Sequence, residues 1–377
     1  MAGRILITGG AGFIGSHLAD ELLHHGYQVR ALDCLIPQVH GPGAGRPAYL
    51  NGEVELIKGD VRDATAVDKA LHGVDAVFHL AAMVGVGQSM YEIEKYTSVN
   101  NSGTAVLLEA IAQTGNIKKL VVASSMSIYG EGRYRDSSGN HYDNLQRPVQ
   151  QLQAGKWELH NGTSEPLMPI PTPESKAPSL SSVYALSKYD QERMSIIVGN
   201  SYRTPVVALR FFNVYGTRQA LSNPYTGALA IFASRFLNNK SPRIFEDGLQ
   251  KRDFVSVRDV ATACRLALEV DQNEAQVFNI GSGASINVLE VLDRLGRVLG
   301  CEHIQPEITR TYRAGDIRHC FADISAARQI LGYQPEVSFE DGLRELAEWL
   351  QGQIAVDRVP EAHSELPMRG LTLTFIL

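Results

Sequence analysis

Short apolar runs alternate with amphipathic stretches through the first half of the chain. Runs of five or six residues, rich in β-branched side chains, predict strands over 4–8, 28–33, 54–58, 76–80, 120–124 and 206–211. Apolar residues spaced three and four apart predict helices over 13–25, 64–72, 104–114 and 184–200. Because this alternation is typical of strand–helix–strand units, we predict an α/β fold, a doubly wound parallel sheet.

Residues 131–181 interrupt this pattern. They are rich in Gly, Ser, Asn, Gln and Pro, and they contain the sequence Pro-Ile-Pro-Thr-Pro-Glu. An irregular stretch of this length is uncommon within a compact domain unless it has a function, so we predict a lid or an insertion. A disordered linker is the alternative.

A glycine-rich turn, Thr-Gly-Gly-Ala-Gly-Phe-Ile-Gly, joins the first predicted strand to the first predicted helix. A helix N-terminus offers unpaired N–H groups and the positive end of the helix dipole, so such a turn can hold the pyrophosphate of a dinucleotide. Gly9 permits the tight turn, Gly12 the close approach of the ligand, and Gly15 the packing of helix on strand. A turn of this kind without a ligand is the alternative.

Asp33 ends the second predicted strand, 18 residues after Gly15. An acid at this place hydrogen-bonds the adenosine ribose and repels a 2′-phosphate, which favours NAD over NADP, although a plain turn residue is the alternative. We therefore assign residues 1–220 to an NAD-binding Rossmann-type domain that carries the insertion at 131–181.

The pattern loosens into short helices and strands after residue 220. We assign residues 221–358 to a smaller C-terminal substrate-binding region with returns to the Rossmann sheet near 252–282. Residues 359–377 form a tail with an apolar end, which we expect to pack or pair with another part of the chain.

The composition changes this picture little. The chain has 377 residues, of which 44% are hydrophobic and 20% charged, and a net charge of −6. This balance indicates no nucleic-acid partner and no membrane surface. The four cysteines form no CxxC pair, and no apolar run approaches membrane-spanning length. We therefore expect reduced thiols and a cytoplasmic protein.

Tyr184 and Lys188 open the helix predicted over 184–200, and their spacing places the phenol and the ammonium one turn apart on one face. A lysine and a positively charged nicotinamide both favour the phenolate, so the pair can act as a base. Tyr91 and Lys95 have the same spacing. We favour Tyr184 because it follows a strand that ends in serines, on the side of the sheet where a cofactor would lie.

That strand runs into Ser124 and Ser125, and Ser127 follows. Ligands of open α/β sheets bind beyond the carboxyl ends of the strands, so these hydroxyls are expected to face the reacting centre. A Ser–His–Asp hydrolase is the competing hypothesis. It is disfavoured because no G-x-S-x-G elbow surrounds Ser124 or Ser125.

Over residues 3–350 the chain resembles the extended short-chain dehydrogenase/reductases of the nucleotide-sugar epimerase/dehydratase family. Besides the motifs above, the matching stretches are Gly59-Asp60-Val61, His79-Leu80-Ala81-Ala82, Asn100 with Gly103-Thr104, 210–216, 252–255, 278–281 and 313–316. The resemblance implies an enzyme that binds NAD and acts on a nucleotide sugar. It also implies a homodimer formed through helices near 97–114 and 184–200.

The resemblance also implies roles for single residues. Tyr184 would be the acid/base, Lys188 would hold the nicotinamide ribose, and Ser125 would bind the reacting sugar oxygen. The implied NAD-binding residues are Gly9, Gly12, Phe13, Ile14, Gly15, Asp33, Asp60, Val61, Leu80, Ala81, Ala82, Asn100, Ser124, Tyr184, Lys188 and Phe211. The implied substrate-binding residues are Ser125, Ser127, Asn213, Arg252 and Arg313.

Arginine forks suit the oxygens of a diphosphate, although surface ion pairing is the alternative for Arg252 and Arg313. The family's 4,6-dehydratases carry Asp and Glu where this chain has Met126 and Ser127, so dehydration is disfavoured. A 4-epimerase needs only removal of the C4 hydroxyl proton by Tyr184 and reversible passage of the C4 hydride to NAD and back.

The insertion and residues 219–227 resemble the dTDP-L-rhamnose 4-epimerase branch, which makes dTDP-L-rhamnose the favoured substrate. In that branch the insertion carries paired cysteines like a zinc knuckle. This chain has none there, and His141 and His160 are too few to replace them. We therefore predict no metal and a lid held by packing around Trp157.

Three alternatives remain open. They are a UDP-hexose 4-epimerase, a nucleotide-sugar reductase or dehydratase, and a non-catalytic NAD-responsive regulator. The regulator is disfavoured because a protein with that role would be expected to have lost Ser125, Tyr184 or Lys188, and this chain has all three.

Overall fold

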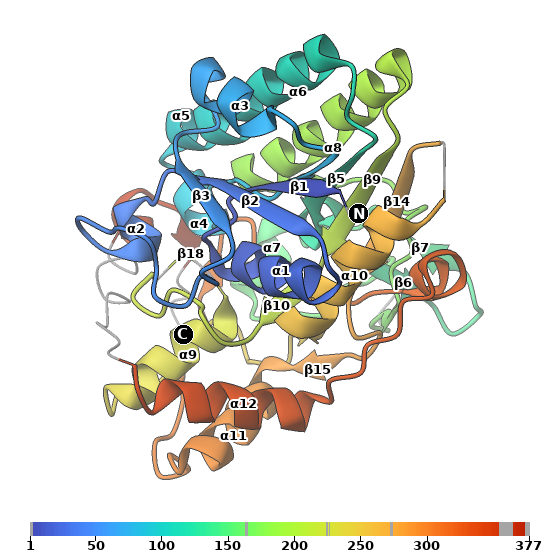
Figure 1. Ribbon diagram of the computed structural model, residues 1–377. Coiled ribbons are helices and arrows are strands. Elements are labelled where there is room, and N and C mark those ends of the chain that lie inside the picture. Colours follow the sequence, from blue (N-terminus) through green and yellow to red (C-terminus); the bar gives the residue numbers. More distant parts are fainter. Residues whose placement is uncertain are drawn as a thin grey trace.

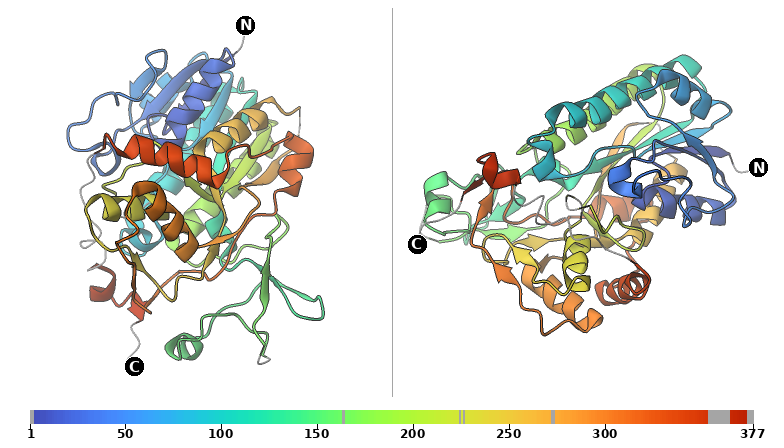
Figure 2. Two further views of the ribbon diagram at one scale, coloured as in Figure 1. Left: turned by 90° about the horizontal axis from the view of Figure 1, so that it is seen from below. Right: turned by 90° about the vertical axis from the view of Figure 1, so that its left-hand side faces the viewer.

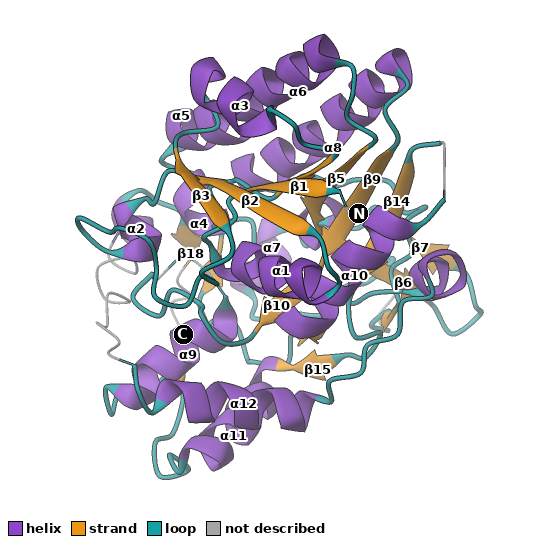
Figure 3. Ribbon diagram, viewed as in Figure 1, coloured by secondary structure: helices purple, strands orange, loops and turns teal. Residues whose placement is uncertain are grey.

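The computed structural model describes residues 3–162, 165–223, 225, 227–271, 274–353 and 365–373. Its centre is a seven-stranded sheet in the order β14-β9-β5-β4-β1-β2-β3, parallel throughout (Figure 3). The strands are β1 (Arg4–Thr8), β2 (Gln28–Asp33), β3 (Glu55–Lys58), β4 (Ala76–His79), β5 (Lys119–Ser125), β9 (Val206–Phe211) and β14 (Gln276–Ile280). The strand order reverses between β1 and β4, and a crevice at this point is where open α/β sheets bind ligands.

Helices cover both faces of the sheet (Figure 1). On one face lie α1 (Phe13–His24) and α10 (Val257–Glu269), and on the other lie α3 (Ala64–Leu71), α6 (Gly103–Thr114) and α8 (Val183–Tyr202). The predicted doubly wound fold is confirmed, and the six predicted strands and four predicted helices end within two residues of the observed ones.

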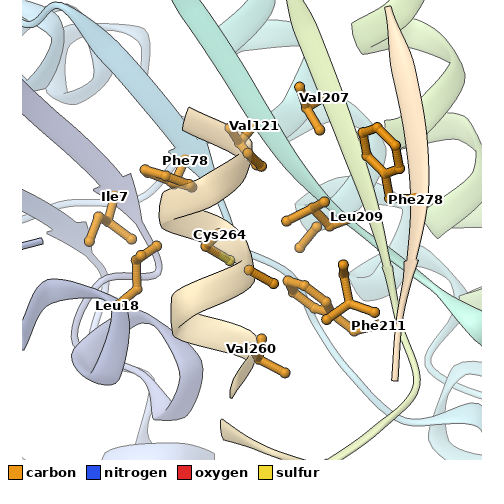
Figure 4. Close-up of a cluster of buried hydrophobic side chains, with 14 of the residues drawn as sticks. Ile7, Leu18, Phe78, Val121, Val207, Leu209, Phe211, Val260, Cys264 and Phe278 are labelled. Carbon is orange, nitrogen blue, oxygen red and sulfur yellow. The ribbon is translucent and has the colours of Figure 1, made fainter. Parts of the chain in front are cut away.

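Each face of the sheet has its own apolar core. Under α1 and α10, side chains of Ile7, Leu18, Phe78, Leu209 and Cys264 interdigitate (Figure 4). Under α3, α6 and α8 lies a second cluster built from Leu6, Val77, Leu107, Val122 and Ala208, among others. Because strand residues alternate between faces, neighbours such as Leu6 and Ile7 contribute to different cores.

Short elements line the rim between β2 and β5. They are α2 (Pro37–His40), α4 (Val86–Ser89), α5 (Ile93–Tyr96), the π-helical η1 (Thr97–Ser102) and the 3₁₀-helical η2 (Met126–Tyr129). Since the helix η1 continues directly into α6, the segment near 97–114 is one helical body.

A further packing unit lies below the sheet in Figure 1, around a third apolar cluster that includes Phe232, Leu292 and Leu346. Its helices are α9 (Ala228–Leu237), α11 (Val288–Leu299) and α12 (Phe339–Leu350). Its short strand pairs are β11 (Arg243–Ile244) with β16 (Glu307–Ile308), and β12 (Lys251–Arg252) with β15 (Ile286–Asn287). The chain returns to the sheet layer in between, through β13 (Phe254–Ser256), α10 and β14, and β13 pairs with β10 (Asn213–Tyr215).

Two elements flank α12 in the chain. They are the π-helical η3 (Ala327–Leu331) before it and the strand β18 (Thr372–Leu373) after it. β18 pairs antiparallel with β17 (Tyr312–Arg313), so this part of the tail pairs with the body, as expected for its apolar end. The remainder of the 359–377 tail, apart from 365–371, lies outside the described residues. Among the described helices, none combines the length and apolar character needed to span a membrane.

The insertion is ordered over its described residues, so the disordered-linker alternative is wrong for them. It holds an antiparallel sheet of β7 (His141–Tyr142), β6 (Arg133–Arg135) and β8 (Met168–Ile170), and a short helix α7 (Val149–Gln153). Its apolar cluster comprises Tyr134, Leu159 and Leu167 rather than the predicted packing around Trp157. Figure 2 shows the insertion projecting from the side of the body.

Glu158 joins the insertion to the body. Its carboxylate accepts hydrogen bonds from Arg318 at 2.6 Å and from His319 Nε2 at 2.9 Å. These two partners hold the pKa of Glu158 at about 2, below its usual 4.5, although burial acts in the opposite direction. A carboxylate with a lowered pKa stabilises the fold fully above its unfolded pKa.

We therefore expect the contribution of Glu158 to stability to be lost as the pH falls from about 4.5 to about 2. Thermal denaturation across this range measures it. In the Glu158→Gln variant, the melting temperature should fall less steeply with acid than in the unsubstituted protein. Equal slopes for the two proteins would contradict this account of the Glu158 contacts.

Candidate active site

A cavity of about 730 Å³ lies along the carboxyl ends of the central strands, from the β1–α1 turn to α9 and β11. Its volume lies within the range of small-molecule and cofactor sites. Among the described residues, every predicted site residue except Asn100 lines it. The sheet topology thus brings together residues that are separated by as much as 304 positions, from Gly9 to Arg313.

The glycine turn forms the floor of one end of the cavity. Gly9 has a φ of 71°, which favours glycine, and its N–H donates to Leu32 O at 2.8 Å. A Cβ at Gly9 would lie 2.9 Å from Ala81 N, and one at Gly15 would lie 2.3 Å from Gly9 O. No described side chain caps α1, whose N-cap residue is Gly12, so the helix N-terminus is left to a ligand.

Asp33 stands at the edge of this turn. Its Oδ2 accepts from Ala11 N at 3.0 Å, and its Oδ1 accepts from Leu35 N at 2.9 Å. The carboxylate is therefore fixed against the glycine turn while it faces the cavity. An acid at this place can hydrogen-bond the adenosine ribose of NAD. The adjacent turn, which has no room for side chains, can hold the pyrophosphate.

Other predicted NAD-binding residues surround this end. Asp60 pairs with Arg62 at 2.7 Å, and this partner lowers the pKa of Asp60. Asn100 does not reach the cavity, contrary to the expectation from the resemblance. Its Oδ1 accepts from Met83 N at 2.7 Å, and its Nδ2 donates to Ser187 Oγ at 2.9 Å. Asn100 therefore braces the main chain of Met83, which does line the cavity.

Tyr184 and Lys188 lie in the first turns of α8, which begins after Ser182. The Ser182 hydroxyl accepts from Ala185 N at 3.1 Å and so caps the helix. Ser125, at the end of β5, is hydrogen-bonded to Tyr184, and its Oγ also lies 2.9 Å from Ser127 Oγ. The two segments therefore converge on one point of the cavity wall.

The two serines of β5 have different partners. Ser124 Oγ donates to Glu192 Oε2 at 2.6 Å, and Glu192 also pairs with Arg210 at 2.7 Å. The Ser124 hydroxyl therefore already donates its proton to a buried ion pair. Ser125 is therefore the serine whose hydroxyl can serve a ligand at Tyr184.

Burial dominates the electrostatics at this point. It raises the pKa of Tyr184 to about 12, and the hydrogen bond from Ser125 lowers it only in part. Burial also lowers the pKa of Lys188 to about 7, against the opposing effect of Glu192. The expected lowering of the Tyr184 pKa by Lys188 is not among the effects that set this pKa in the protein alone. The phenol is a stronger acid only when a further positive charge lies beside it.

A buried polar chain behind Lys188 escaped the sequence reasoning. Lys188 Nζ donates to Gln191 Oε1 at 2.8 Å, and Gln191 Nε2 donates to Thr104 Oγ1 at 2.8 Å. His79 lies 2.8 Å from both Thr8 Oγ1 and Thr104 Oγ1, and burial lowers its pKa to about 3, so it is neutral. His79 and Thr104 were signalled by the family motifs, whereas Gln191 had no signal of its own.

The second tyrosine–lysine pair lies elsewhere. Tyr91 donates to Tyr225 Oη at 2.9 Å, and Lys95 pairs with Glu92 at 2.7 Å. Among the described residues that line the cavity, Lys95 is present and Tyr91 is not. Because the Tyr91 phenol lies outside the cavity, position separates the two pairs as the sequence reasoning expected.

The far end of the cavity holds two arginines. Arg252 donates to Ile317 O at 2.6 Å and to Arg318 O at 2.8 Å. Arg313 directs Nε and Nη2 at Asp316 Oδ1, at 3.0 and 2.7 Å. Both side chains line the cavity. The alternative of ion pairing holds for Arg313, which pairs with Asp316, whereas the partners of Arg252 are carbonyl groups.

Three buried amide oxygens in the lining of the cavity lack a hydrogen-bond partner among the described residues. They are Asn213 Oδ1, Gln219 Oε1 and Gln250 Oε1. Buried polar atoms in folded proteins are normally paired. These amide oxygens can accept hydrogen bonds from the hydroxyl or N–H groups of a polar ligand, while the two arginines suit an anionic group.

The insertion stands apart from the cavity. Of its described residues, Ser181 alone, the last of the segment, lines the wall. The insertion is therefore not a lid in the described part of the chain. The same described residues contain no group of three or more His, Cys, Asp or Glu side chains placed to hold a metal ion.

Relatives of the chain bear on this site. A dTDP-L-rhamnose 4-epimerase of Burkholderia thailandensis is 35% identical, over 93% of this chain and 96% of its own length. The solved UDP-glucose 4-epimerase of Thermotoga maritima with UDP-glucose is 31% identical, with a TM-score of 0.75 over 92% of this chain and 98% of that one. The UDP-glucuronic acid 4-epimerase of Bacillus cereus, solved with UDP-glucuronic acid and NAD, is 29% identical, with a TM-score of 0.75 over 92% and 99%.

The family profile described as NAD dependent epimerase/dehydratase family matches residues 5–281. This range includes the glycine turn, Asp33, Ser125, Tyr184 and Lys188. The chain thus belongs to the NAD-dependent epimerase/dehydratase family, whose NAD site and nucleotide-sugar chemistry agree with the cavity described above.

Proposed function

We propose that the protein is a nucleotide-sugar 4-epimerase whose favoured substrate is dTDP-L-rhamnose, which it converts to dTDP-6-deoxy-L-talose. The observation that carries this proposal is the convergence of Ser125 and Tyr184 on the cavity, with Met126 and Ser127 in place of a carboxylate pair. The named activity of the Burkholderia relative supports the choice of sugar.

The residues of the cavity divide the chemistry between them. NAD, when bound at the glycine turn and Asp33, supplies a hydride acceptor that returns the hydride. Tyr184 takes the proton of the C4 hydroxyl as that carbon is oxidised, and it returns the proton after the 4-keto sugar has turned over. Ser125 holds the C4 oxygen, and Lys188 holds the nicotinamide ribose and adds positive charge beside the phenol.

The remaining residues serve binding. Asn213, Arg252 and Arg313 are proposed to hold the diphosphate, because forked guanidinium groups match its oxygens. Ser127 is proposed to contact the sugar. The region from residue 221 to residue 358 would thus provide Arg252 and Arg313 of the substrate site, and residues 1–220 its other three residues and the cofactor site. The described residues of both regions line the same cavity.

The second candidate is a UDP-hexose 4-epimerase, favoured by the similarity to the Thermotoga enzyme. It differs in the base and the sugar, not in the chemistry at C4. A reductase would consume the reduced cofactor, and a dehydratase would require the acid and base that Met126 and Ser127 cannot provide.

A panel of nucleotide sugars tests the proposal. The purified protein is incubated with dTDP-L-rhamnose, UDP-glucose and UDP-N-acetylglucosamine in turn, and NMR reads the configuration at C4. We expect inversion of dTDP-L-rhamnose to be the fastest, with no net oxidation or reduction of NAD. Faster inversion of a UDP-hexose would replace the favoured substrate, and net change in the cofactor would contradict epimerisation.

We also propose a cytoplasmic homodimer formed through η1, α6 and α8. Apolar side chains stand exposed on this side of the chain, with Ile93 at 53%, Leu186 at 46% and Ile197 at 58% exposure. Leu186 and Ile197 lie about three turns apart on α8, so they share a face. Covering that face would remove them from water.

A further inference from the structure

Residues 313–319 form a loop between the cavity and the insertion. On the cavity side, the Asp316 carboxylate holds Arg313, and the carbonyl groups of Ile317 and Arg318 hold Arg252. On the other side, the side chains of Arg318 and His319 reach the insertion. The position of both cavity arginines therefore depends on how this one loop is held.

Arg147 of the insertion holds the loop from behind. Its side chain is 2% exposed, and Nη1 donates to Glu246 Oε1 at 2.7 Å. Nη2 donates to the carbonyl oxygen of Asp316 at 3.2 Å, and Nε lies 3.2 Å from Glu131 Oε1. The guanidinium also lies 5.3 Å from the ring centre of Tyr312. Arg147 thus holds the main chain of Asp316, whose carboxylate orients Arg313.

Arg318 is the second arginine that connects the insertion to the 313–319 loop. Its fully buried guanidinium donates to Glu246 at 3.0 Å and to Asp247 at 2.6 Å, besides Glu158 of the insertion. Its N–H donates to both carboxylate oxygens of Glu131 at 2.8 Å. The same residue therefore ties the insertion on one side and presents its carbonyl to Arg252 on the other.

A network of buried ion pairs adds little to the free energy of folding, because the cost of removing the charges from water offsets most of their mutual attraction. It is good at fixing geometry, since each guanidinium fork satisfies carboxylates and carbonyls in a single arrangement. Diphosphate recognition by arginine also depends on geometry, because the planar guanidinium fork must meet two oxygens at once. The hydrogen bonds and ion pairs of Arg147 and Arg318 connect the insertion to the 313–319 loop. A shift of this loop would displace Arg252 and Arg313.

We propose that the insertion is a buttress for the diphosphate end of the cavity, and that Arg147 is its principal positioning residue. Arg147 orients Arg313 and Arg252 through Asp316 and the 313–319 loop, while it touches no ligand itself. This inference rests on the proposed function, in which those arginines hold the diphosphate of the nucleotide sugar.

Binding of dTDP by calorimetry tests the inference on the full NAD-loaded protein. In the Arg147→Met variant, the Kd for dTDP is expected to rise by about tenfold or more, as for the loss of one hydrogen bond to a charged group. The Kd for thymidine, which lacks the diphosphate, and the NAD content should stay unchanged. With nucleotide sugar, KM should rise while kcat stays within about twofold, because Arg147 is remote from Tyr184.

Arg133→Met is the matched control. Arg133 belongs to the same insertion, and its guanidinium bonds both carboxylate oxygens of Asp143, which is also part of the insertion, at 2.7 Å. Its loss should leave the Kd for dTDP unchanged. An equal rise in both variants would overturn the inference, because it would show a general effect of loosening the insertion.

Arg147→Met leaves Glu131 and Glu246 without their cation, so Arg147→Lys serves as a second variant that keeps the charge. A lysine cannot fork between Glu246 and Asp316, so the Kd for dTDP should again rise. A normal Kd in folded Arg147→Lys would overturn the inference. If the unsubstituted protein bound dTDP but epimerised no nucleotide sugar, the proposed function would be wrong. The Kd values for dTDP of the Arg147 and Arg133 variants would still test the role of Arg147.

Discussion

Replacing Tyr184 by phenylalanine is expected to lower turnover by about a thousandfold and to leave NAD binding intact. The substitution removes the hydroxyl that is proposed to exchange the C4 proton and that is hydrogen-bonded to Ser125. It keeps the ring, whose centre lies 6.4 Å from that of Tyr96 in an edge-to-face arrangement. Because the phenol is buried and Lys188 keeps its bond to Gln191, the cofactor site should be unchanged. Steady-state rates and the NAD content of the purified variant measure the two effects.

Tyr91→Phe is the matched control for this prediction. Tyr91 precedes Lys95 with the same spacing, and its hydroxyl likewise makes a hydrogen bond, to Tyr225. Its ring lies outside the described lining of the cavity. Turnover in this variant should be close to normal. Near-normal turnover in Tyr184→Phe would remove Tyr184 from the chemistry, whatever the control showed.

Replacing Gly15 by alanine is expected to abolish NAD binding and to lower the melting temperature. The new Cβ would lie 2.3 Å from Gly9 O and 2.7 Å from Gly10 Cα. Both are main-chain atoms of the turn, so no side chain can rotate away to make room. The turn would have to move off α1, and the pyrophosphate cradle would be lost with it. Bound NAD in the purified protein and thermal denaturation give the two readouts.

Gly52→Ala provides the comparison. A Cβ at Gly52 would meet nothing within 4 Å, so the substitution should change neither NAD content nor melting temperature by much. If Gly15→Ala retained NAD like Gly52→Ala, the turn could not be the cradle that the cavity suggests. Loss of stability with full retention of NAD would also count against it.

Local patterns predicted the fold well. The strands β1, β2 and β9 begin and end where the apolar runs do, because a buried parallel strand needs a continuous apolar segment. The parallel sheet between two layers of helices follows from the alternation of strands and helices. Asp33 and Ser125 lie on one cavity because they end two parallel strands of the sheet, β2 and β5, and Tyr184 joins them from the start of α8.

Burial and long-range contacts were not predictable in this way. The spacing of Tyr184 and Lys188 indicated a pair, but it could not show that burial would raise the pKa of the phenol to about 12. Asn100 was expected at the cofactor, yet its amide is used by the main chain of Met83. A sequence motif marks a residue without fixing the direction of its side chain.

The insertion is the clearest case. Glu158 and Arg318 are 160 positions apart, and Arg147 and Glu246 are 99 apart, so no periodicity or spacing could connect them. The irregular composition of 131–181 predicted a lid or an insertion. The structure instead places the described part of the segment beside the loop that carries Arg313, where ion pairs hold it.

The central claim is that C4 is oxidised and then reduced with the same hydride on an enzyme that keeps its cofactor. Nucleotide sugar carrying deuterium at C4, incubated in ordinary water with the protein, tests it most directly. Mass spectrometry and NMR of the epimer should find the deuterium retained at C4 with inverted configuration. Replacement of the deuterium by solvent hydrogen would contradict the account, because the hydrogen would then have left as a proton.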